Sequence, residues 1–388
     1  MSPLSTTVQP PLLGAAASIS TAPRNRAAPP LRYATVFDGA RRTMLRPQAE
    51  DWMVGVYLLG LWGAVVAGNG PRRTFALGVT TIVLAVYSLL QAVAHQHPLR
   101  STRRELLRRL ALVFGLLAPF GFLHHILAAV TTHTVDTWLY DFDLAVFGLE
   151  PALAWDRYVE PVTTEWFSFF YLSYYFVILA FLAPFVFLAR SGRLVQEFAF
   201  GLLFVFCVGQ TMYMLVPGYG PHVMLASRFE HALEGPFWWR LVATTVHSGQ
   251  ARADIFPSLH TAAPAFFTMF SLRHRHLPIF RLTWPITALV ASQIIIATMF
   301  LRWHYAIDIV AGLGLAGLGQ WAATKVAARN GAASSAVSPS ATAPCAAPDA
   351  STARASEEPP GSPPRASGVL LRTARSAEAP GETPAPGL

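Results

Sequence analysis

The sequence predicts an all-α fold, a polytopic bundle of about six to eight membrane-spanning helices. The composition supports this, because 53% of the 388 residues are hydrophobic and only 13% are charged, whereas an ordinary soluble domain carries about 25% charged residues. The second observation is a series of apolar segments that approach the roughly 20 residues a helix needs to cross a bilayer. These segments lie at about 52–67, 75–94, 107–130, 166–189, 197–216, 257–272, 282–300 and 304–327.

Two of the apolar segments, 52–67 and 257–272, are short for a span, which is why the expected number of helices is a range. Gly and Pro residues occur inside several segments. They do not exclude spanning helices, because neighbouring helices and side chains can satisfy the backbone groups that Pro and Gly leave unpaired.

Both ends of the chain differ from this apolar middle. Residues 1–48 mix Ser, Thr, Pro, Ala and Arg without periodicity, and residues 329–388 are rich in Ala, Pro, Ser and Gly. Such segments bury too little apolar surface to offset their chain entropy, so we expect two disordered tails. Between them we expect N-terminal transmembrane helices over 49–134 and a second membrane domain over 135–328.

The composition also excludes several classes of protein. The two cysteines, Cys207 and Cys345, are too few for a disulfide framework or a Cys-rich metal site. The net charge of +8 does not indicate nucleic-acid binding, because no basic stripe is interleaved with aromatic residues. Of the 29 basic residues only Lys325 is a lysine, a bias that indicates a GC-rich, bacterial coding sequence.

The loop charges predict an orientation in the membrane, because Arg and Lys are enriched in cytoplasmic loops. If the N-terminus is cytoplasmic, the second, fourth and sixth loops lie inside. They hold Arg100, Arg103, Arg104, Arg108, Arg109, Arg190, Arg193, Arg273, Arg275 and Arg281. The third loop then lies outside and holds Asp136, Asp141, Asp143, Glu150, Asp156, Glu160 and Glu165 against Arg157.

Only Arg72 and Arg73, in the short first loop, oppose this orientation. We therefore expect a plasma-membrane protein with both termini in the cytoplasm. The loop before Pro257 and the loop at Arg302 then lie on the same, extracytoplasmic face.

His304 and Asp308 are candidate catalytic residues. They are four residues apart, so on a helix they share one face. A carboxylate beside an imidazole can fix its tautomer and stabilise the imidazolium that forms when the ring acts as a nucleophile or a base. A carboxylate within a spanning segment is costly and usually functional, although a packing bridge or a position in the headgroup layer would also explain the pair.

His260, in Pro257-Ser258-Leu259-His260, adds a second imidazole. Pro257 suits the first turn of a helix, which places Ser258 and the amides after it at a positive helix end that favours an anion. His304 also opens a helix, so we expect two such ends to face one pocket. Arg302 carries a guanidinium suited to bidentate phosphate contacts. Together these groups favour phosphoryl transfer, with one histidine as nucleophile and the other as acid and base.

These two motifs resemble the type-2 phosphatidic acid phosphatase superfamily, and within it the branch related to inositol phosphorylceramide synthase, an inositolphosphotransferase. Phe256-Pro257-Ser258-Leu259-His260 is similar to that branch's Pro-Ser-Leu-His, where better known phosphatases have Pro-Ser-Gly-His. Thr298–Gly312 is similar to its His-Tyr-x-x-Asp motif with both flanks. Weaker similarities to bacterial members lie in Pro217-Gly218-Tyr219-Gly220-Pro221, Asp141-Phe142-Asp143, Phe147-Gly148, Tyr171 and Tyr174.

The resemblance covers roughly residues 135–325 and implies a six-helix phosphatase-type core. It implies that His304 forms a phosphohistidine, that Asp308 orients it and that His260 is the acid and base. It implies no metal and no other cofactor. The substrate would be a lipid phosphate or a phospholipid headgroup in the bilayer.

The chain departs from the classical phosphatases in its cations. It has no Lys-x6-Arg-Pro element, and Thr298 stands where they have an arginine before the nucleophile. Other groups must then bind the phosphate. The candidates are Arg302, Ser258, His222, Arg252 and Arg228.

Several alternatives remain open from the sequence. A phosphatase passes the phosphoryl group to water, and a synthase passes a phosphate-bearing headgroup to a lipid hydroxyl. A proton-coupled transporter without enzymatic activity would use Asp308 and the histidines differently, but it predicts internal repeats with broken helices, which we do not find. In a metalloenzyme, His260, His304 and Asp308 would be metal ligands.

Overall fold

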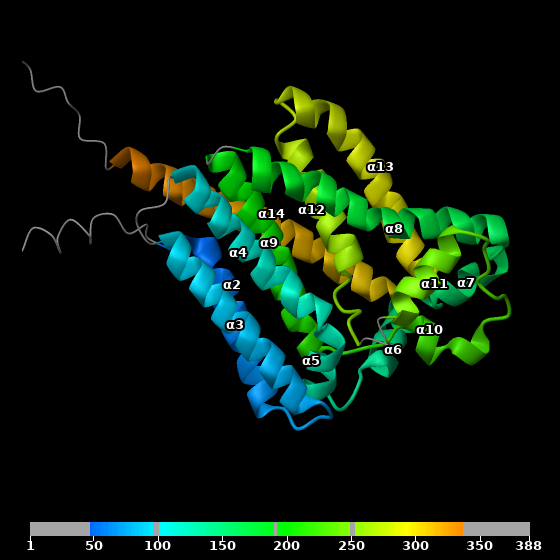
Figure 1. Ribbon diagram of the computed structural model, residues 1–388. Coiled ribbons are helices and arrows are strands. Elements are labelled where there is room, and N and C mark those ends of the chain that lie inside the picture. The colour runs from blue at the N-terminus through cyan, green and yellow to red at the C-terminus, as the bar shows by residue number, and fades with distance from the viewer. Residues whose placement is uncertain (1–46, 96–100, 190–191, 249–252, 337–388) are drawn as a thin grey trace, which may run out of the picture. The chain divides into compact units, whose positions relative to one another are not determined.

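Every regular element that the computed structural model describes is a helix (Figure 1); the described residues are 47–95, 101–189, 192–248 and 253–336. Six helical segments are long and apolar enough to cross a membrane. This confirms the predicted polytopic all-α bundle and a multi-pass membrane protein. The six are α2 (Ala49–Ala67), α3 (Arg73–His95), α8 (Pro161–Ala183) continued by the π-helical turn η2 (Pro184–Leu188), α9 (Arg193–Leu215), α13 (Pro278–Phe300) and α14 (Ala306–Ala336).

Two of the expected spans differ from straight membrane helices. The third is divided into α4 (Ser101–Gly121) and α5 (Leu123–Val130), which meet at 64° and would make a seventh span if counted together. Pro119 lies just before the break, where its missing N–H and its ring disrupt the helical hydrogen bonds. The sixth is α12 (Leu259–Arg273), whose 15 residues are fewer than a span requires.

The two expected disordered tails fall mostly outside the described residues. Of the N-terminal tail only Pro47 and Gln48 are described. At the other end α14 continues to Ala336, past the boundary at 329 that the composition suggested for the C-terminal tail.

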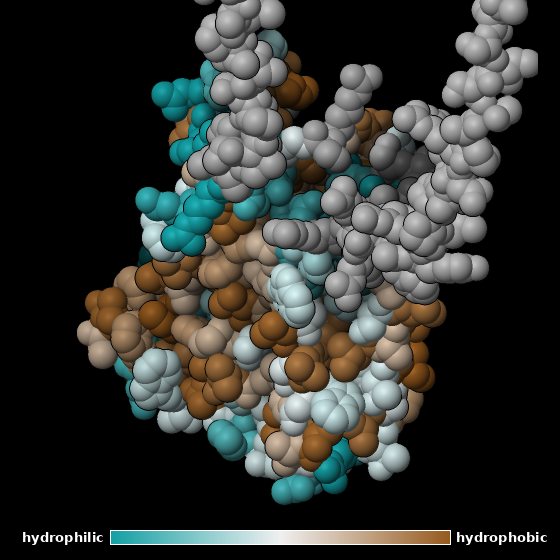
Figure 2. Space-filling view, turned by 90° about the vertical axis from the view of Figure 1, so that its left-hand side faces the viewer, coloured by the Kyte–Doolittle hydropathy of each residue, from teal (hydrophilic) through white to brown (hydrophobic). Residues whose placement is uncertain are grey.

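Apolar side chains dominate the outer surface of the helices, and Figure 2 shows them in brown over much of one face. Large residues such as Ile82, Leu89 and Leu289 are each about 63% exposed. In water such a surface would be an aggregation or interaction site, whereas in a bilayer it contacts lipid tails.

Helix α9 packs against helices from both parts of the chain. It contacts α2 and α4 on the N-terminal side and α12 and α14 on the C-terminal side. Stacked aromatic rings fill the C-terminal packing: Phe185 lies 3.8 Å from Phe198, and Phe181 lies 4.6 Å from Phe267, between ring centroids. Since α12 also contacts α8, α13 and α14, the helix that carries His260 is held from several sides.

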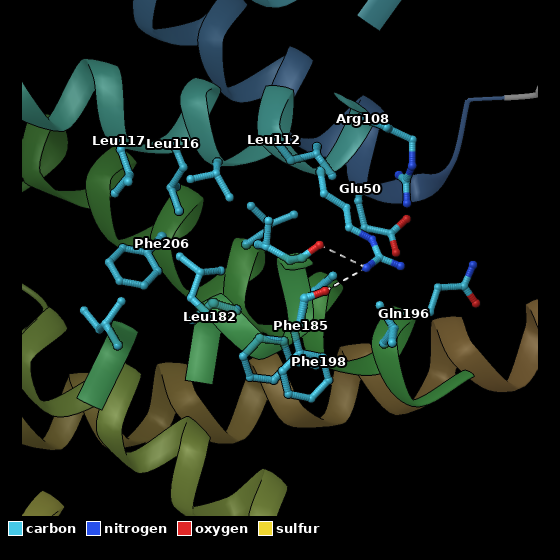
Figure 3. Close-up of a pocket in the computed structure, with 18 of the residues that line it drawn as sticks. Glu50, Arg108, Leu112, Leu116, Leu117, Leu182, Phe185, Gln196, Phe198 and Phe206 are labelled. Atoms are coloured by element: carbon cyan, nitrogen blue, oxygen red, sulfur yellow. Dashed lines mark hydrogen bonds between the residues drawn. The ribbon is translucent and has the colours of Figure 1, made fainter. Parts of the chain in front are cut away.

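A cavity of about 740 Å³ lies among α2, α4, α8 and α9. Figure 3 shows polar side chains, among them Glu50, Arg108 and Gln196, at one end, and Leu117 and Phe206 at the other. Most of its lining is aliphatic or aromatic.

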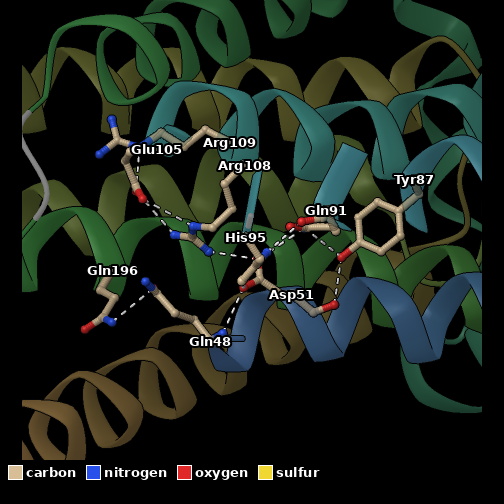
Figure 4. A network of polar contacts seen from close by, with 9 residues as sticks. All are labelled: Gln48, Asp51, Tyr87, Gln91, His95, Glu105, Arg108, Arg109 and Gln196. Atoms are coloured by element: carbon tan, nitrogen blue, oxygen red, sulfur yellow. Dashed lines mark hydrogen bonds and ion pairs between the residues drawn. The ribbon is translucent and has the colours of Figure 1, made fainter. Parts of the chain in front are cut away.

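Asp51 is the centre of a buried polar network that joins α2, α3 and α4 (Figure 4). Its Oδ1 accepts hydrogen bonds from Arg108 Nη1 at 2.9 Å and from Gln91 Nε2 at 3.2 Å, and its Oδ2 accepts from the Gln48 N–H at 2.8 Å. Arg108 is 5% exposed, so this charge, which we counted with the loops, lies inside α4.

Arg109 donates to the carbonyls of Phe185 and Ala189, each at 2.8 Å, which ties α4 to the end of α8.

Asp51→Ala is expected to destabilise the N-terminal helices by about 3–5 kcal/mol, because removing one member of a buried pair leaves the other charge uncompensated. The measurement is the thermal unfolding midpoint of the purified protein in detergent. Asp141→Ala is the matched control, since Asp141 is exposed. Equal midpoints for the two variants would contradict a structural role for the network.

Candidate functional site

His304 and Asp308 lie together at the start of α14. His304 Nδ1 is 3.2 Å from Asp308 Oδ2, and the same oxygen accepts a hydrogen bond from the Tyr305 N–H at 3.0 Å. His304 precedes the helix rather than lying on it, because α14 begins at Ala306. Asp308 is fully buried, and its Oδ1 has no hydrogen-bonding partner among the described residues. One carboxylate thus orients both the imidazole and the turn that carries it.

His260 lies beside this pair, in contact with two tyrosines of α8. Its ring centroid is 4.6 Å from that of Tyr171, with the planes 14° apart, and 4.1 Å from that of Tyr174. The centroid of the His304 ring is 6.2 Å away. His260 Nε2 is buried without a hydrogen-bonding partner in the described part of the chain. The two imidazoles are therefore close enough to contact one small group between them.

The two histidine motifs touch through their backbones. The Ser258 N–H donates to the carbonyl of Asp308 at 3.1 Å. At Gly312, one turn further along α14, a Cβ would lie only 2.6 Å from the Ser258 carbonyl oxygen. Glycine at this position therefore allows α14 to approach the start of α12 closely.

The start of α14 is already occupied by a carboxylate. Asp143, in α6 (Asp136–Phe147), accepts hydrogen bonds from the Ala306 N–H at 2.6 Å and the Ile307 N–H at 2.9 Å. We expected this helix end to face an anion, and the structure corrects that: Asp143 takes the place of an anionic ligand, as side-chain caps do. Burial raises the pKa of Asp143. The start of α12, by contrast, is capped by the hydroxyl of Ser258.

Asp136 positions the Gly-rich loop in a similar way. It accepts hydrogen bonds from the Tyr219 and Gly220 N–H groups at 2.8–3.0 Å, and the Tyr305 hydroxyl is 3.4 Å away. Gly220 has φ +91°, and a Cβ there would lie 2.4 Å from the Trp303 carbonyl oxygen. The loop that contains Gly220 therefore packs directly against the segment that leads to His304.

Arg302, a candidate phosphate ligand, is held in an ion pair. Its Nη2 lies 2.6 Å from Asp156 Oδ1 and donates to the His231 carbonyl at 2.5 Å. Its guanidinium also lies over the ring of Phe229, 3.9 Å from the centroid. Burial alone would raise the pKa of Asp156. Hydrogen bonds from His231 and from backbone N–H groups, together with the charge of Arg302, lower this pKa overall. The carboxylate is thus charged and neutralises the arginine.

The other candidate phosphate ligands are placed differently. Ser258 is the N-cap of α12, and its hydroxyl accepts from the Thr261 N–H at 3.3 Å. The ring of His222, in α10 (Pro221–Met224), lies edge-on against Trp303 with centroids 4.5 Å apart.

The candidate Arg228, in η3 (Ala226–Arg228), is exposed, and its guanidinium donates a hydrogen bond to the Tyr140 hydroxyl. Arg252 lies outside the described residues.

Several side chains around the site carried little signal in the sequence. Tyr171 and Tyr174 showed only a weak family similarity, whereas in the structure both rings lie against His260. Asp136, Asp143 and Asp156 appeared as charges of the third loop. The Asp141-Phe142-Asp143 similarity was the one signal for Asp143, and no spacing in the sequence indicated the partners of Asp136 or Asp156.

Glu150 is a buried carboxyl group near the site. It caps α7 (Pro151–Trp155) through Oε1, which accepts from the Ala152 N–H at 3.2 Å, and its Oε2 has no partner among the described residues. Burial, together with the nearby charges of Asp143 and Asp308, raises the pKa of Glu150 to about 7.

This pKa predicts how stability depends on pH. The ordinary value is 4.5, so the folded state binds this proton more tightly than the unfolded state. The contribution of Glu150 is therefore complete below about pH 4.5 and is lost as the pH rises through 7, an effect of roughly 3 kcal/mol. Glu150→Gln, which is neutral throughout, should remove this loss.

The measurement is the unfolding midpoint of Glu150→Gln minus that of the unmodified protein, between pH 4.5 and 8. The difference should grow with pH and level off above 7. Glu234→Gln, at an exposed position, is the matched control. A flat difference for Glu150→Gln would contradict the raised pKa.

Comparison with known proteins adds one finding. Residues 137–322 match the model of the PAP2 superfamily, which supports the superfamily suggested by the two histidine motifs. The match spans just under half of the chain and includes both motifs. It supports phosphatase or phosphotransferase activity on a phosphorylated substrate. No curated protein and no solved structure matches the chain.

Proposed function

From this match to the PAP2 superfamily, we propose that the chain is an integral membrane phosphotransferase or phosphatase that acts on a lipid phosphate or a phospholipid headgroup. The observation that carries the proposal is the pairing of His304 Nδ1 with the buried Asp308 at 3.2 Å, with the ring of His260 6.2 Å from that of His304. A nucleophile, its orienting carboxylate and a second proton-transfer group are the parts that covalent phosphoryl transfer needs.

In the proposed first step, His304 attacks phosphorus through Nε2, since Asp308 holds Nδ1. A P–N bond forms as the P–O bond to the leaving alcohol breaks, and His260 gives its proton to the leaving oxygen. Asp308 stabilises the positive charge on the phosphorylated imidazole. In the second step, His260 takes a proton from water or from a lipid hydroxyl, whose oxygen attacks phosphorus and releases His304.

The negative charge of the phosphoryl group needs donors near these rings. We propose the start of α12, with Ser258 as its N-cap, together with His222 and Arg228. Arg302 would contribute less than a free guanidinium because Asp156 offsets its charge. Arg252 stays a candidate from the sequence alone.

The acceptor distinguishes a phosphatase from a synthase. The Leu in Pro-Ser-Leu-His favours the inositolphosphotransferase-like branch, in which a lipid hydroxyl accepts the headgroup. The loop charges favour a site on the extracytoplasmic face of the plasma membrane with both termini inside. The second membrane domain, 135–328, would then carry the chemistry.

His304→Ala is expected to lower turnover roughly 10³-fold or more, the loss typical when a covalent nucleophile is removed. Purified protein in nanodiscs would be given phosphatidic acid, phosphatidylinositol and ceramide, with released phosphate and new lipids measured together. His276→Ala is the matched control, at an exposed histidine. Undiminished turnover in His304→Ala would contradict the assignment. Phosphate release without any new lipid would contradict a synthase.

Tyr174→Leu is expected to lower kcat about tenfold with little change in KM, because the ring of His260 would lose the aromatic contact 4.1 Å away that helps to position it. Tyr174→Phe keeps that contact and should keep most of the activity. Steady-state kinetics on the best substrate of the panel checks this. Equal kcat for both variants would show that the ring contact does not position His260.

A further inference from the structure

The cavity among α2, α4, α8 and α9 lies within membrane-spanning helices. Its volume of about 740 Å³ is within the range of roughly 300–1,000 Å³ typical of small-molecule sites. Along α8 and η2 it is lined from Tyr174 to Val186, a rise of roughly 16–18 Å at 1.5 Å per residue. The walls are apolar, with Leu112, Leu116, Leu182, Phe198, Leu202 and Phe206 among them. Such a space suits a long aliphatic chain.

Glu50 lines the polar end of this cavity. It is fully buried, and neither carboxyl oxygen has a hydrogen-bonding partner from another described residue. A buried carboxyl group without a partner is costly. The adjacent Asp51, by contrast, accepts three hydrogen bonds. An acceptor left open at one end of an apolar cavity points to a ligand with a donor at that position.

We propose that this cavity binds a membrane lipid alcohol, with its aliphatic chain between α4, α8 and α9 and a head hydroxyl donating to Glu50. The cavity is also lined by Arg108, Arg109 and Arg193, and Glu105 forms ion pairs with the first two. A cationic headgroup would be repelled by these arginines, and an anionic headgroup would be repelled by Glu50. A neutral hydroxyl donates to a carboxyl group without either repulsion. The cavity reaches Tyr174, whose ring lies 4.1 Å from that of His260, but its occupancy does not depend on the proposed function.

The first test fills the cavity. The probe is a hexadecyl glycerol ether with a diazirine in its chain, cross-linked to the full-length protein in nanodiscs and mapped by peptide mass spectrometry. Ala199 lines the cavity, and Ala199→Trp is expected to lower labelling of α4 and α8 peptides at least tenfold. Ala85→Trp is the matched control, at an exposed position on α3, and should label like the unmodified protein.

The second test removes the acceptor. Glu50→Leu should weaken competition by unlabelled ether about 2- to 10-fold, the effect of one hydrogen bond, whereas Glu50→Gln keeps an acceptor and should stay within about twofold. In delipidated protein, Glu50→Leu should not lower the unfolding midpoint, because it removes an unpaired buried polar group. A purely structural Glu50 would instead give a lower midpoint.

Three results would overturn the proposal. One is equal labelling in Ala199→Trp and Ala85→Trp. Another is competition unchanged by Glu50→Leu. The third is competition by anionic phosphatidylglycerol or by a quaternary ammonium lipid that exceeds competition by the ether, since that would exclude the neutral alcohol.

Discussion

The hydrogen bond from the Ser258 N–H to the Asp308 carbonyl, 3.1 Å long, is the contact on which the candidate site depends. It joins the first residues of α12 to the first turn of α14, so each histidine motif is positioned by the other. Gly312 permits the approach, because any side chain there would meet the Ser258 carbonyl. The separation of the His260 and His304 rings therefore follows from backbone packing as well as from side-chain rotamers.

Carboxylates build the loops around this contact. Asp143 caps α14, Asp136 binds the Gly220 loop and Asp156 pairs with Arg302. Each joins segments more than 80 residues apart in the chain. These acidic residues of the predicted third loop thus have a structural role. It also leaves fewer cations for a phosphate than a count of nearby arginines would indicate.

Much of the fold could be predicted because apolar length and charge patterning act locally. The expected segments all appear as helices, and the deviations have local causes: Pro119 precedes the break between α4 and α5, and the N-cap Ser258 starts α12 too late for a full span. Arg108 was misread because its burial depends on Asp51, which lies 57 residues earlier. A charged residue inside an apolar helix shows its partner only after the helices have packed.

By itself, the sequence determined the membrane class, the approximate spans and the four-residue spacing of His304 and Asp308, because these depend on composition and on residues close together in the chain. Only the tertiary structure decided that Tyr171 and Tyr174 contact His260, that Asp143 caps the start of α14 and that Arg302 pairs with Asp156. Those contacts join residues separated by 86 to 163 positions. No local pattern encodes such pairs, since they form only when the packed helices bring their loops together.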